Sequence, residues 1–324
     1  VYTESGNGYL ESGSIKTGKD GVGVYIAGNG GTITATNAFN MALGDGSDGD
    51  NKGSFGFVNV GSNNKIYSDI SNVTLQNNSI YIYSKDTSGT SANPQITNNT
   101  NIAATGKNNY GLYSAGYVVN NGNMNLAAGT GNVGAYSVKG GTIENRTGVI
   151  ITVGGSVPIN DEYGIGMAAG YAWTKKDLLK PVSQRPQQTT GNIINRGTIN
   201  VNGASSIGIG HLHNIQAVYA GGTINVAGAG SVGVYTEVAT RPVLAGKNDD
   251  HGIANTTGNI VGTETVEVSG NITVSGNNSS GVFAKNNGSI TLKDNTVNSL
   301  ADSDNKTTAK ITVSGTKSYG AVLE

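Results

Sequence analysis

The sequence contains no cysteine, five prolines and few charged residues, and each shortage excludes a class of protein. Without cysteine the chain has no disulfide, no thiol nucleophile and no cysteine-based zinc site. With so little proline it is not a proline-rich disordered chain. Charged residues make up 13%, about half the usual fraction, and the formal net charge is −1. No global basic charge is therefore present to attract nucleic acid or an anionic membrane.

Long apolar runs and a recognisable leader are also missing. No apolar stretch approaches the roughly 18–20 residues that a membrane-spanning helix needs. The sequence opens at Val1 in mid-pattern, with no methionine and no basic segment typical of a signal peptide. It ends with SYGAVLE, inside a repeat unit. We therefore expect a fragment of a longer chain, cut at both ends.

Glycine and asparagine are abundant, with 51 and 41 residues among 324. Glycine is present at roughly twice its usual share. Most of the aromatic residues are tyrosines, with 15 Tyr against 4 Phe and 1 Trp. A chain dominated by Gly, Asn, Thr, Ser, Val and Ile indicates many short strands joined by tight turns.

One ten-residue pattern recurs along the chain. It begins with Ile, has Gly at its fifth position and ends with a second Gly. Five copies keep this spacing: IAATGKNNYG, INVNGASSIG, INVAGAGSVG, ITVSGNNSSG and ITVSGTKSYG, which begin at residues 102, 199, 224, 272 and 311. Looser copies with insertions begin at residues 124 and 151. Such a repeat is the signature of a solenoid architecture.

Two further elements follow each copy of the pattern. A short apolar stretch comes first, such as GVYIA at 23–27 or GVYTE at 233–237, and then a segment such as GGTITA at 30–35. The shortest spacings between successive second glycines are 23 and 25 residues. Three strands in so short a unit cannot bury an apolar face alone, whereas stacked units pair each strand in parallel with its counterpart.

The alternation within each copy predicts which side chains face inward. Ile224 and Val226 are expected to point into the coil and Asn225 to point out, and residues 199–201 repeat this pattern. We predict an all-β fold, a parallel β-helix with three short strands per coil and roughly ten coils, about 50 Å long. Glycine and asparagine are expected at corners with positive φ. Asparagines at equal positions of successive coils are expected to form internal amide ladders.

The whole chain, residues 1–324, is expected to form one continuous β-helix segment. Four stretches interrupt the repeat, at about 36–54, 171–190, 238–258 and 293–309. In a solenoid, insertions are surface loops that often lie on the binding face.

The strings GTINVNGASSIGIG, GGTINVAGAGSVGVYTE and GGTIENRTGVIITV resemble the Gly/Asn-rich coils of bacterial type V secreted autotransporter adhesins. The resemblance covers about 100–155, 192–237 and 270–324 well, and the insertions poorly. It implies a right-handed β-helix displayed at the cell surface and tethered to a translocating outer-membrane β-barrel at the C-terminal end of the full chain. The partner would be a host cell-surface protein or glycan, or the surface of another bacterium.

Aromatic residues recur two positions after the repeat glycine, at Tyr25, Tyr113, Tyr136, Tyr235 and Phe283. In a β-helix they would stack in register on one face. One interpretation is an aromatic platform for sugars or a protein partner, since tyrosine offers apolar area and a hydroxyl. The other interpretation is a structural ladder that fills the coil or one of its grooves.

The insertion at 171–190 is the least repeat-like and most basic segment. It contains the only tryptophan and four cations, which we predict as partner-binding residues: Trp173, Lys175, Lys176, Lys180 and Arg185. An exposed tryptophan with basic neighbours is typical of an interaction hot spot. The alternative is a loop that packs Trp173 back on the rod.

Two motifs are weak candidates for metal binding. The spacing of Asp45, Asp48 and Asp50 departs from the EF-hand calcium loop, and the distal glutamate of that loop is missing. His211 and His213 would share a strand face, but a zinc site needs at least a third ligand. We therefore expect a solvated acidic loop and surface or corner histidines, with no metal and no cofactor.

Catalysis is a possibility that this fold class leaves open, since some parallel β-helices cleave polysaccharides. Asp249 and Asp250, followed by His251, could supply an acid and a base. The outward positions of the repeat, however, are Asn, Thr and Ser. We expect a non-catalytic adhesive stalk with no catalytic residues. The alternatives are a polysaccharide-cleaving enzyme and a pure spacer whose ligand site lies elsewhere in the chain.

Overall fold

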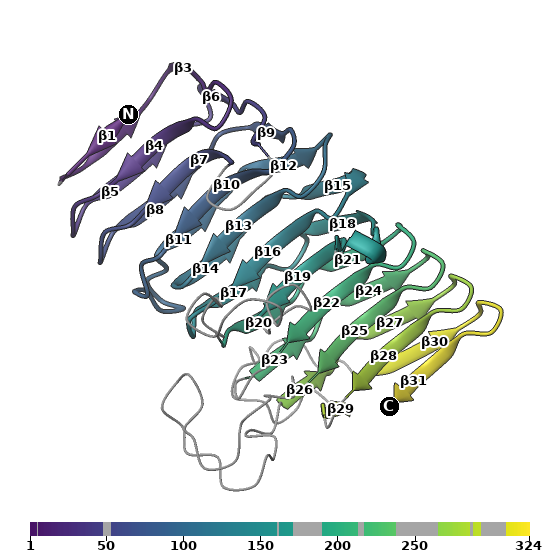
Figure 1. The fold of residues 1–324 in the computed structure, drawn as a ribbon. Helices are drawn as coiled ribbons and strands as arrows, with labels where there is room; N and C mark the ends of the chain where they lie inside the picture. The colour runs from purple at the N-terminus through teal and green to yellow at the C-terminus, as the bar shows by residue number, and fades with distance from the viewer. Residues whose placement is uncertain are drawn as a thin grey trace, which may run out of the picture.

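A computed structural model describes residues 1–4, 6–47, 53–160, 162–170, 190–212, 217–237, 265–285, 288–292 and 309–324. Its strands follow one another around a coil, and every third strand returns to the same sheet (Figure 1). Neighbouring strands pair in parallel, as β10 does with both β7 and β13. The described chain is therefore a parallel β-helix with three strands per coil, as the repeat predicts.

The first sheet has 11 strands, one from each coil and the last from the C-terminal end. In chain order they are β1 (Tyr2–Thr3), β4 (Val22–Ile26), β7 (Ser54–Asn59), β10 (Ser79–Ser84), β13 (Tyr110–Ser114), β16 (Val133–Ser137), β19 (Ile165–Ala169), β22 (Ile207–Leu212), β25 (Val232–Glu237), β28 (Ser280–Lys285) and β31 (Tyr319–Leu323). Most of them begin one residue before the second glycine of the repeat, and β4, β13, β16 and β25 contain the tyrosine that follows it two positions later.

The second sheet has 10 strands, which matches the predicted number of coils. They are β2 (Gly8–Leu10), β5 (Thr32–Ala35), β8 (Lys65–Ser68), β11 (Ile96–Asn98), β14 (Tyr117–Asn120), β17 (Thr142–Asn145), β20 (Asn192–Asn195), β23 (Ala217–Ala220), β26 (Thr265–Val268) and β29 (Ile290–Leu292). At about 4.8 Å per coil, ten coils give a rod about 50 Å long.

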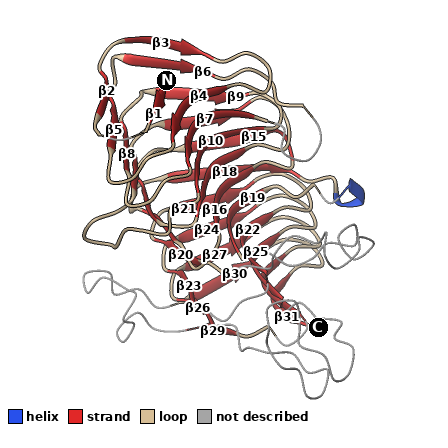
Figure 2. Cartoon of the chain, turned by 60° about the vertical axis from the view of Figure 1, so that its left-hand side comes forward, coloured by secondary structure: helices blue, strands red, loops and turns tan. Residues whose placement is uncertain are grey.

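The third sheet has 8 strands and contains the Ile-x-Val segments of the repeat. They are β9 (Asn72–Leu75), β12 (Asn101–Ala104), β15 (Met124–Thr130), β18 (Ile150–Gly155), β21 (Thr198–Val201), β24 (Thr223–Val226), β27 (Asn271–Val274) and β30 (Lys310–Val313). A separate pair, β3 (Gly13–Lys16) and β6 (Phe39–Ala42), forms the same side of the first two coils (Figure 2). A short 3₁₀ helix, η1 (Pro158–Asn160), follows β18.

Inward-facing side chains form one hydrophobic core along the rod. In the third sheet Ile199, Ile224 and Ile272 lie in register and are at most 1% exposed. Asn225 points outward and is half-buried, and its Nδ2 donates to Asn200 Oδ1 over 2.9 Å. The predicted alternation of inward isoleucine and outward asparagine is confirmed.

An internal amide ladder lies at the corner where the second sheet ends. Asn98, Asn120, Asn145 and Asn195 are the last residues of four successive strands of that sheet, and each is at most 1% exposed. The Nδ2 of each of the first three donates to the Oδ1 of the asparagine in the next coil, over 2.8, 3.0 and 3.0 Å. The predicted ladder is present, and it pairs amide groups that would otherwise be buried without partners, although Asn98 Oδ1 at its first member has no hydrogen-bond partner among the described residues.

A second polar ladder lies at the turn that leads into the first sheet. Asn132 Oδ1 accepts a hydrogen bond from the backbone N–H of Asn109 over 3.0 Å. In later coils Ser231 Oγ accepts from Ser206 N–H over 3.0 Å, and Ser279 Oγ accepts from Ser231 N–H over 3.1 Å. These residues stand two positions before the second glycine, so the Asn or Ser there joins one turn to the next.

The positive-φ residue of each turn stands three positions before the second glycine. Asn108, Ser205, Gly230 and Asn278 have φ values of 56°, 55°, 65° and 54°. Glycine and asparagine were predicted at such corners, and both occur there. Serine also occurs at this position, which the composition does not predict, because a non-glycine residue there is strained.

The two glycines that define the repeat have a different role from the one predicted. Neither Gly228 nor Gly233 has positive φ. A Cβ on Gly228 would lie 1.8 Å from Gly203 O, and a Cβ on Gly233 would lie 2.5 Å from Gly281 O. These positions need glycine because the backbones of adjacent coils approach too closely for any side chain.

Part of the stretch 36–54 is not an insertion. Within it, β6 pairs with β3, and Phe39, Met41 and Leu43 are each 5% exposed in the core. The prediction of a surface loop was wrong for this part. The segment TNAFNMAL lacks the repeat pattern but keeps the apolar alternation of a strand, which the search for glycine spacing overlooked.

Tyr81 stands in β10 at the position that glycine occupies in neighbouring strands. Its side chain is fully buried, and its ring meets that of Phe57 edge to face at 5.7 Å. The hydroxyl lies 2.5 Å from Ser68 Oγ and 3.1 Å from Thr100 Oγ1. Burial raises the pKa of Tyr81 from 10.0 to about 12, although the hydrogen bonds from these two hydroxyls act to lower it.

We expect Tyr81→Phe to lower the free energy of unfolding by about 1–2 kcal/mol at pH 8, because two buried hydroxyls lose a partner. The folded-state pKa lies above the unfolded-state value, so the stability of the wild-type chain falls as the pH rises from 10 to about 12. The variant has no hydroxyl to ionise at this position, so its stability does not fall in this way. The difference in the free energy of unfolding between wild-type chain and variant should therefore be smaller at pH 11 than at pH 8. Denaturant unfolding of both chains at pH 8 and 11 measures this, and an unchanged difference would contradict it.

Candidate functional site

The outer face of the first sheet contains the tyrosines predicted as binding residues. The residues that share their register form the first outward column: Tyr2, Tyr25, Val58, Tyr83, Tyr113, Tyr136, Ala168, Gly210, Tyr235, Phe283 and Val322. The predicted stacking in register on one face is present. The row of aromatic side chains is interrupted at Val58, and again at the two small residues Ala168 and Gly210.

Neighbouring rings in the first outward column contact one another. Tyr83 and Tyr113 are stacked at 5.3 Å, and Tyr113 meets Tyr136 edge to face at 5.2 Å. Two further stacked pairs lie toward the ends of the rod, Tyr2 with Tyr25 and Tyr235 with Phe283. Burial raises the pKa of Tyr83 and Tyr113 above the ordinary value for tyrosine, as expected for hydroxyls that are partly shielded from water.

A second column, which the sequence interpretation missed, runs beside the first. It consists of Val22, Phe55, Ile80, Tyr110, Val133, Ile165, Ile207, Val232, Ser280 and Tyr319. Tyr110 stacks on Tyr136 of the first column at 6.1 Å. Val133, Ile165 and Ala168 form a hydrophobic cluster separate from the core. The two columns therefore belong to one surface, which we call the apolar face.

The signal for the second column was present in the sequence, directly before the repeat glycine. It was obscured because the glycine breaks the strict alternation of the strand. Leu112 is fully buried in the core, and a Cβ on the adjacent Gly111 would also meet core atoms, Met124 Sδ at 3.2 Å and Ile102 Cδ1 at 3.4 Å. With two successive inward positions, Tyr110 and Tyr113 both face outward.

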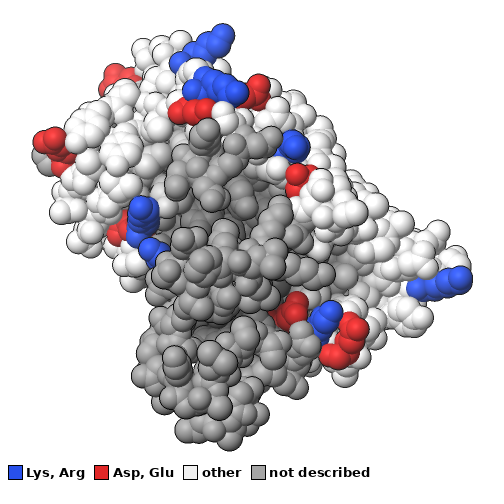
Figure 3. Space-filling view, viewed as in Figure 1, with Lys and Arg blue, Asp and Glu red and all other residues white. Residues whose placement is uncertain are grey.

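The apolar face differs from the other sides of the rod in its chemistry. Neither column contains a charged residue in the described part of the chain. The outward positions of the third sheet are instead mainly short polar side chains, such as Thr198 and Asn200, or Thr223 and Asn225. Among the described residues in view, Figure 3 shows acidic and basic side chains in small mixed groups. Tyr2, Val22 and Tyr319 of the two columns are exposed, whereas Val133, Ile165 and Ala168 at the centre are at most 9% exposed. Apolar side chains that line the outside of a rod are candidates for an interaction site.

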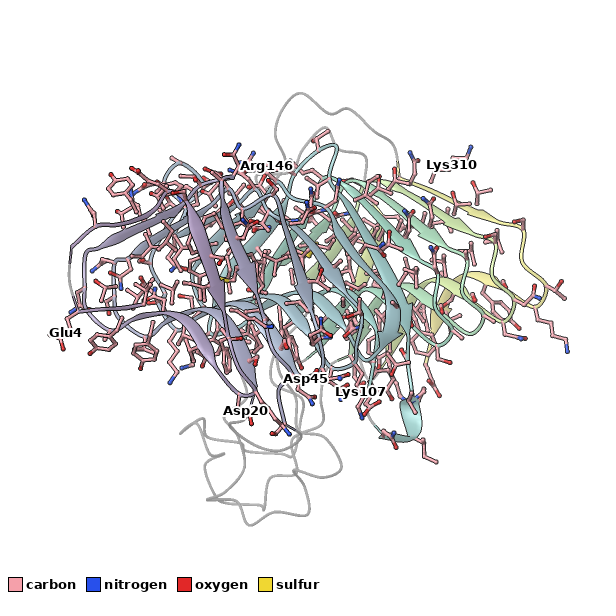
Figure 4. All side chains as sticks on the ribbon, turned by 90° about the horizontal axis from the view of Figure 1, so that it is seen from above. Glu4, Asp20, Asp45, Lys107, Arg146 and Lys310 are labelled. Atoms are coloured by element: carbon pink, nitrogen blue, oxygen red, sulfur yellow. The ribbon has the colours of Figure 1, made fainter. Side chains whose placement is uncertain are left out.

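The described part of the acidic motif has a structural role. Asp45 Oδ1 accepts hydrogen bonds from the N–H and the Nδ2 of Asn77, over 3.0 and 3.1 Å. Asp20 and Asp45 lie along one edge of the rod together with Lys107 (Figure 4). Asp48 and Asp50 lie outside the described residues, so calcium binding by this motif stays untested. Across the described ranges, no group of three or more His, Cys, Asp or Glu could hold a metal ion.

The remaining predicted site residues lie outside the described residues: Trp173, Lys175, Lys176, Lys180, Arg185, His213, Asp249, Asp250 and His251. The ranges 171–189, 213–216 and 238–264 each connect a strand of the first sheet to one of the second, in successive coils. They therefore join the rod at the same corner. The backbone of His211 lies in β22, in register with Ala169 and Thr236.

One buried charge cluster lies on the outer side of the second sheet. Glu144 is 2% exposed, and its Oε1 accepts from Arg196 Nε over 2.9 Å and lies 3.2 Å from an Arg146 guanidinium nitrogen. Its Oε2 accepts from the hydroxyl of Tyr117 over 2.9 Å. Burial and the Glu144 carboxylate raise the pKa of Tyr117. Both carboxylate oxygens are thus used within the fold.

This cluster does not match the carboxylate spacing of glycoside hydrolysis. Glu267 lies in the same outward register as Glu144, three coils further along the rod. Three coils correspond to about 14 Å, whereas the paired carboxylates of most glycosidases stand about 5–9.5 Å apart.

The apolar face is the most extensive candidate site among the described residues. No helix in the described ranges has the length and apolar character needed to cross a membrane. No protein-family model, no curated protein and no solved structure matches this chain.

Proposed function

We propose that this chain is a non-catalytic attachment segment of a surface-displayed passenger, similar in role to an autotransporter adhesin. The observation that supports this best is the apolar face, two columns of mainly aromatic and aliphatic side chains in register on the outer side of the first sheet. The partner is a cell-surface protein or glycan of a host, or the surface of another bacterium. The full chain would be tethered to the outer membrane.

The β-helix suits such a role because backbone pairing alone gives it length. Each coil contacts its neighbours, and the polar ladders at two corners fix the register of adjacent coils. Ten coils then form a rod about 50 Å long, and all the side chains of its outer face keep one orientation. A pure spacer needs the same rod, but it has no need of an apolar exterior.

We expect Tyr113→Lys to lower attachment at least tenfold, because an aromatic anchor in the middle of the apolar face is replaced by a charge. Fluorescently labelled chain is incubated with a panel of cultured mammalian cells and bacteria, and bound fluorescence is measured. Thr223→Lys places the same charge on the outside of the third sheet and serves as the matched control. Circular dichroism checks that both variants keep the fold.

Equal attachment by both variants would contradict the proposed role of the apolar face. A chain without residues 171–190 separates the two predicted binding regions. If that deletion alone abolishes attachment while Tyr113→Lys has no effect, the insertion rather than the apolar face binds the partner.

A further inference from the structure

We propose that the loop between β18 and β19 is a second contact site, which inserts its apolar tip into a pocket of a partner protein. This inference rests on the proposed function, since it adds a further part to the attachment surface and names the class of partner. The loop covers residues 156–164, of which the structure describes all but Asp161, and it includes η1. In Figure 2 η1, drawn in blue, projects from the side of the rod.

The loop is longer than the fold requires at this turn. In the two following coils five residues join the third sheet to the first, 202–206 between β21 and β22 and 227–231 between β24 and β25. The loop after β18 has nine, 156–164, because the repeat copy that begins at residue 151 contains an insertion. Insertions in a solenoid often lie on its binding face. The extra residues therefore call for a role beyond connecting two strands.

Hydrogen bonds fix the base of the loop to the coil that follows. Ser156 N–H donates to Ala204 O over 3.1 Å, and Ser156 Oγ lies 3.0 Å from Ser206 Oγ. Val157 and Glu162 form an antiparallel bridge across the loop, with N···O distances of 2.7 and 3.3 Å. The two arms of the loop are thus held together at its base.

The second arm and the tip of the loop are fixed as well. Glu162 Oε1 accepts a hydrogen bond over 3.3 Å from Nδ2 of Asn108, which belongs to an earlier coil. At the tip, the ring of Pro158 restricts its φ, and Asn160 N–H donates to Val157 O over 2.9 Å. A loop that already has one shape loses less conformational entropy when it binds a partner.

The tip of the loop is apolar and exposed. Ile159 is 92% exposed, the highest fraction among the large hydrophobic side chains of the described residues. Pro158 beside it is exposed, Tyr163 is 38% exposed, and none of the three belongs to the hydrophobic core. Single apolar residues are common on protein surfaces, but these three share one loop whose shape is set by hydrogen bonds. An aliphatic side chain presented in this way is typical of an anchor that a partner's pocket buries.

The charge and chemistry of the loop decide which class of partner fits it. Residues 150–170 contain two acidic residues, Asp161 and Glu162, and no lysine or arginine. The negative surface of anionic lipids would repel such a loop. A glycan needs hydrogen-bonding groups, which the side chains of Pro158 and Ile159 lack. The loop therefore fits an apolar protein pocket that has cationic side chains at its border.

Attachment of two variants tests the loop contact. Ile159→Ser removes the apolar tip, whereas the control Ile150→Ser removes an isoleucine that is 42% exposed at the start of β18. Labelled chains are titrated onto the mammalian cells and bacteria of the attachment assay, and the concentration of half-maximal binding is measured. We expect this concentration to rise about tenfold for Ile159→Ser, since an isoleucine leaves a buried pocket, and to stay within about twofold for Ile150→Ser. Equal values for the wild-type chain and Ile159→Ser would overturn the inference.

The class of partner is tested on the same cells after a protease has removed their surface proteins, and on vesicles of phosphatidylcholine and phosphatidylserine. The inference predicts that protease treatment abolishes the difference between the wild-type chain and Ile159→Ser, and that neither chain binds the vesicles. A difference that persists after protease treatment would overturn the protein partner, as would binding to vesicles that depends on Ile159.

The outcomes separate this inference from the proposed function. If Tyr113→Lys lowers attachment and Ile159→Ser does not, the loop contact is wrong and the role of the apolar face remains. If Ile159→Ser lowers attachment and Tyr113→Lys does not, the loop contact is supported and the role of the apolar face is wrong. A chain that attaches to no cell or bacterium overturns both.

Discussion

Gly208→Ala is expected to lower the free energy of unfolding by about 3 kcal/mol, although it adds a single methyl group. A Cβ at this position would lie 2.5 Å from Gly233 O and 3.0 Å from Ile224 Cγ2. The first contact involves the backbone of the next coil, so relief requires the two coils to separate. Since each coil contacts only its neighbours, one separated junction weakens the rod on both sides.

The matched control for Gly208→Ala lies in the same strand, two residues further along. A Cβ on Gly210 would meet Ile165 Cγ2 and Ile207 Cγ2 at 3.6 Å, which is ordinary van der Waals contact. Gly210→Ala should therefore leave stability unchanged within about 0.5 kcal/mol, or raise it slightly by restricting the unfolded chain. Denaturant unfolding followed by circular dichroism compares the two variants. A similar loss of unfolding free energy in both variants would contradict the account that Gly208 is required because the backbones of adjacent coils approach closely there.

The second large effect is expected inside the amide ladder. Asn145→Leu keeps the size of the side chain but removes a donor and an acceptor. Asn120 Nδ2, now 3.0 Å from Asn145 Oδ1, and Asn195 Oδ1, now 3.0 Å from Asn145 Nδ2, would both lose a partner while buried. Each unsatisfied group costs about 1–3 kcal/mol. We expect the free energy of unfolding to fall by about 3–4 kcal/mol.

Asn225→Leu is the control for the amide ladder, because it removes the same chemical group from the outside of the third sheet. Its hydrogen bond to Asn200 is half-buried, and water can replace it there. The expected loss is below about 0.5 kcal/mol. The midpoint temperature of thermal unfolding is measured for both variants and the wild-type chain. An equal decrease in midpoint temperature for Asn145→Leu and Asn225→Leu would contradict the account of the internal ladder.

The fold class could be predicted from the sequence because the repeat has one period and one alternation. The inward Ile224 and outward Asn225 follow directly from strand geometry, and the third sheet has both as predicted. The amide ladder could also be anticipated, since equal positions of stacked coils must lie above one another.

Two features could not be obtained from local sequence patterns. The role of Gly233 depends on its distance to Gly281 O, a contact between residues 48 positions apart in the sequence. Propensity predicts where glycine allows unusual φ but not where backbones from different coils approach closely. The strand at Phe39–Ala42 was missed because it is paired by tertiary context and lacks the repeat spacing.

The candidate site was predicted in part, for a similar reason. The tyrosines were found because they follow the glycine at a fixed offset. The second column, with Tyr110 and Ile165, belongs to the same face because Gly111 and Leu112 are both inward. A strict alternation would have assigned these residues to the wrong side. Binding by Trp173 and its basic neighbours stays a prediction, since they lie outside the described residues.

Protection of a single introduced thiol tests the central claim most directly, namely that the apolar face is where partners bind. Ile80→Cys places the thiol on the apolar face, and Thr223→Cys places it on the outside of the third sheet, in a chain that otherwise has no cysteine. Maleimide labelling rates are measured for each variant alone and after binding to mammalian cells or bacteria. The account predicts slower labelling of Ile80→Cys in the bound state and an unchanged rate for Thr223→Cys. Equal rates at both positions, or protection of Thr223→Cys alone, would contradict it.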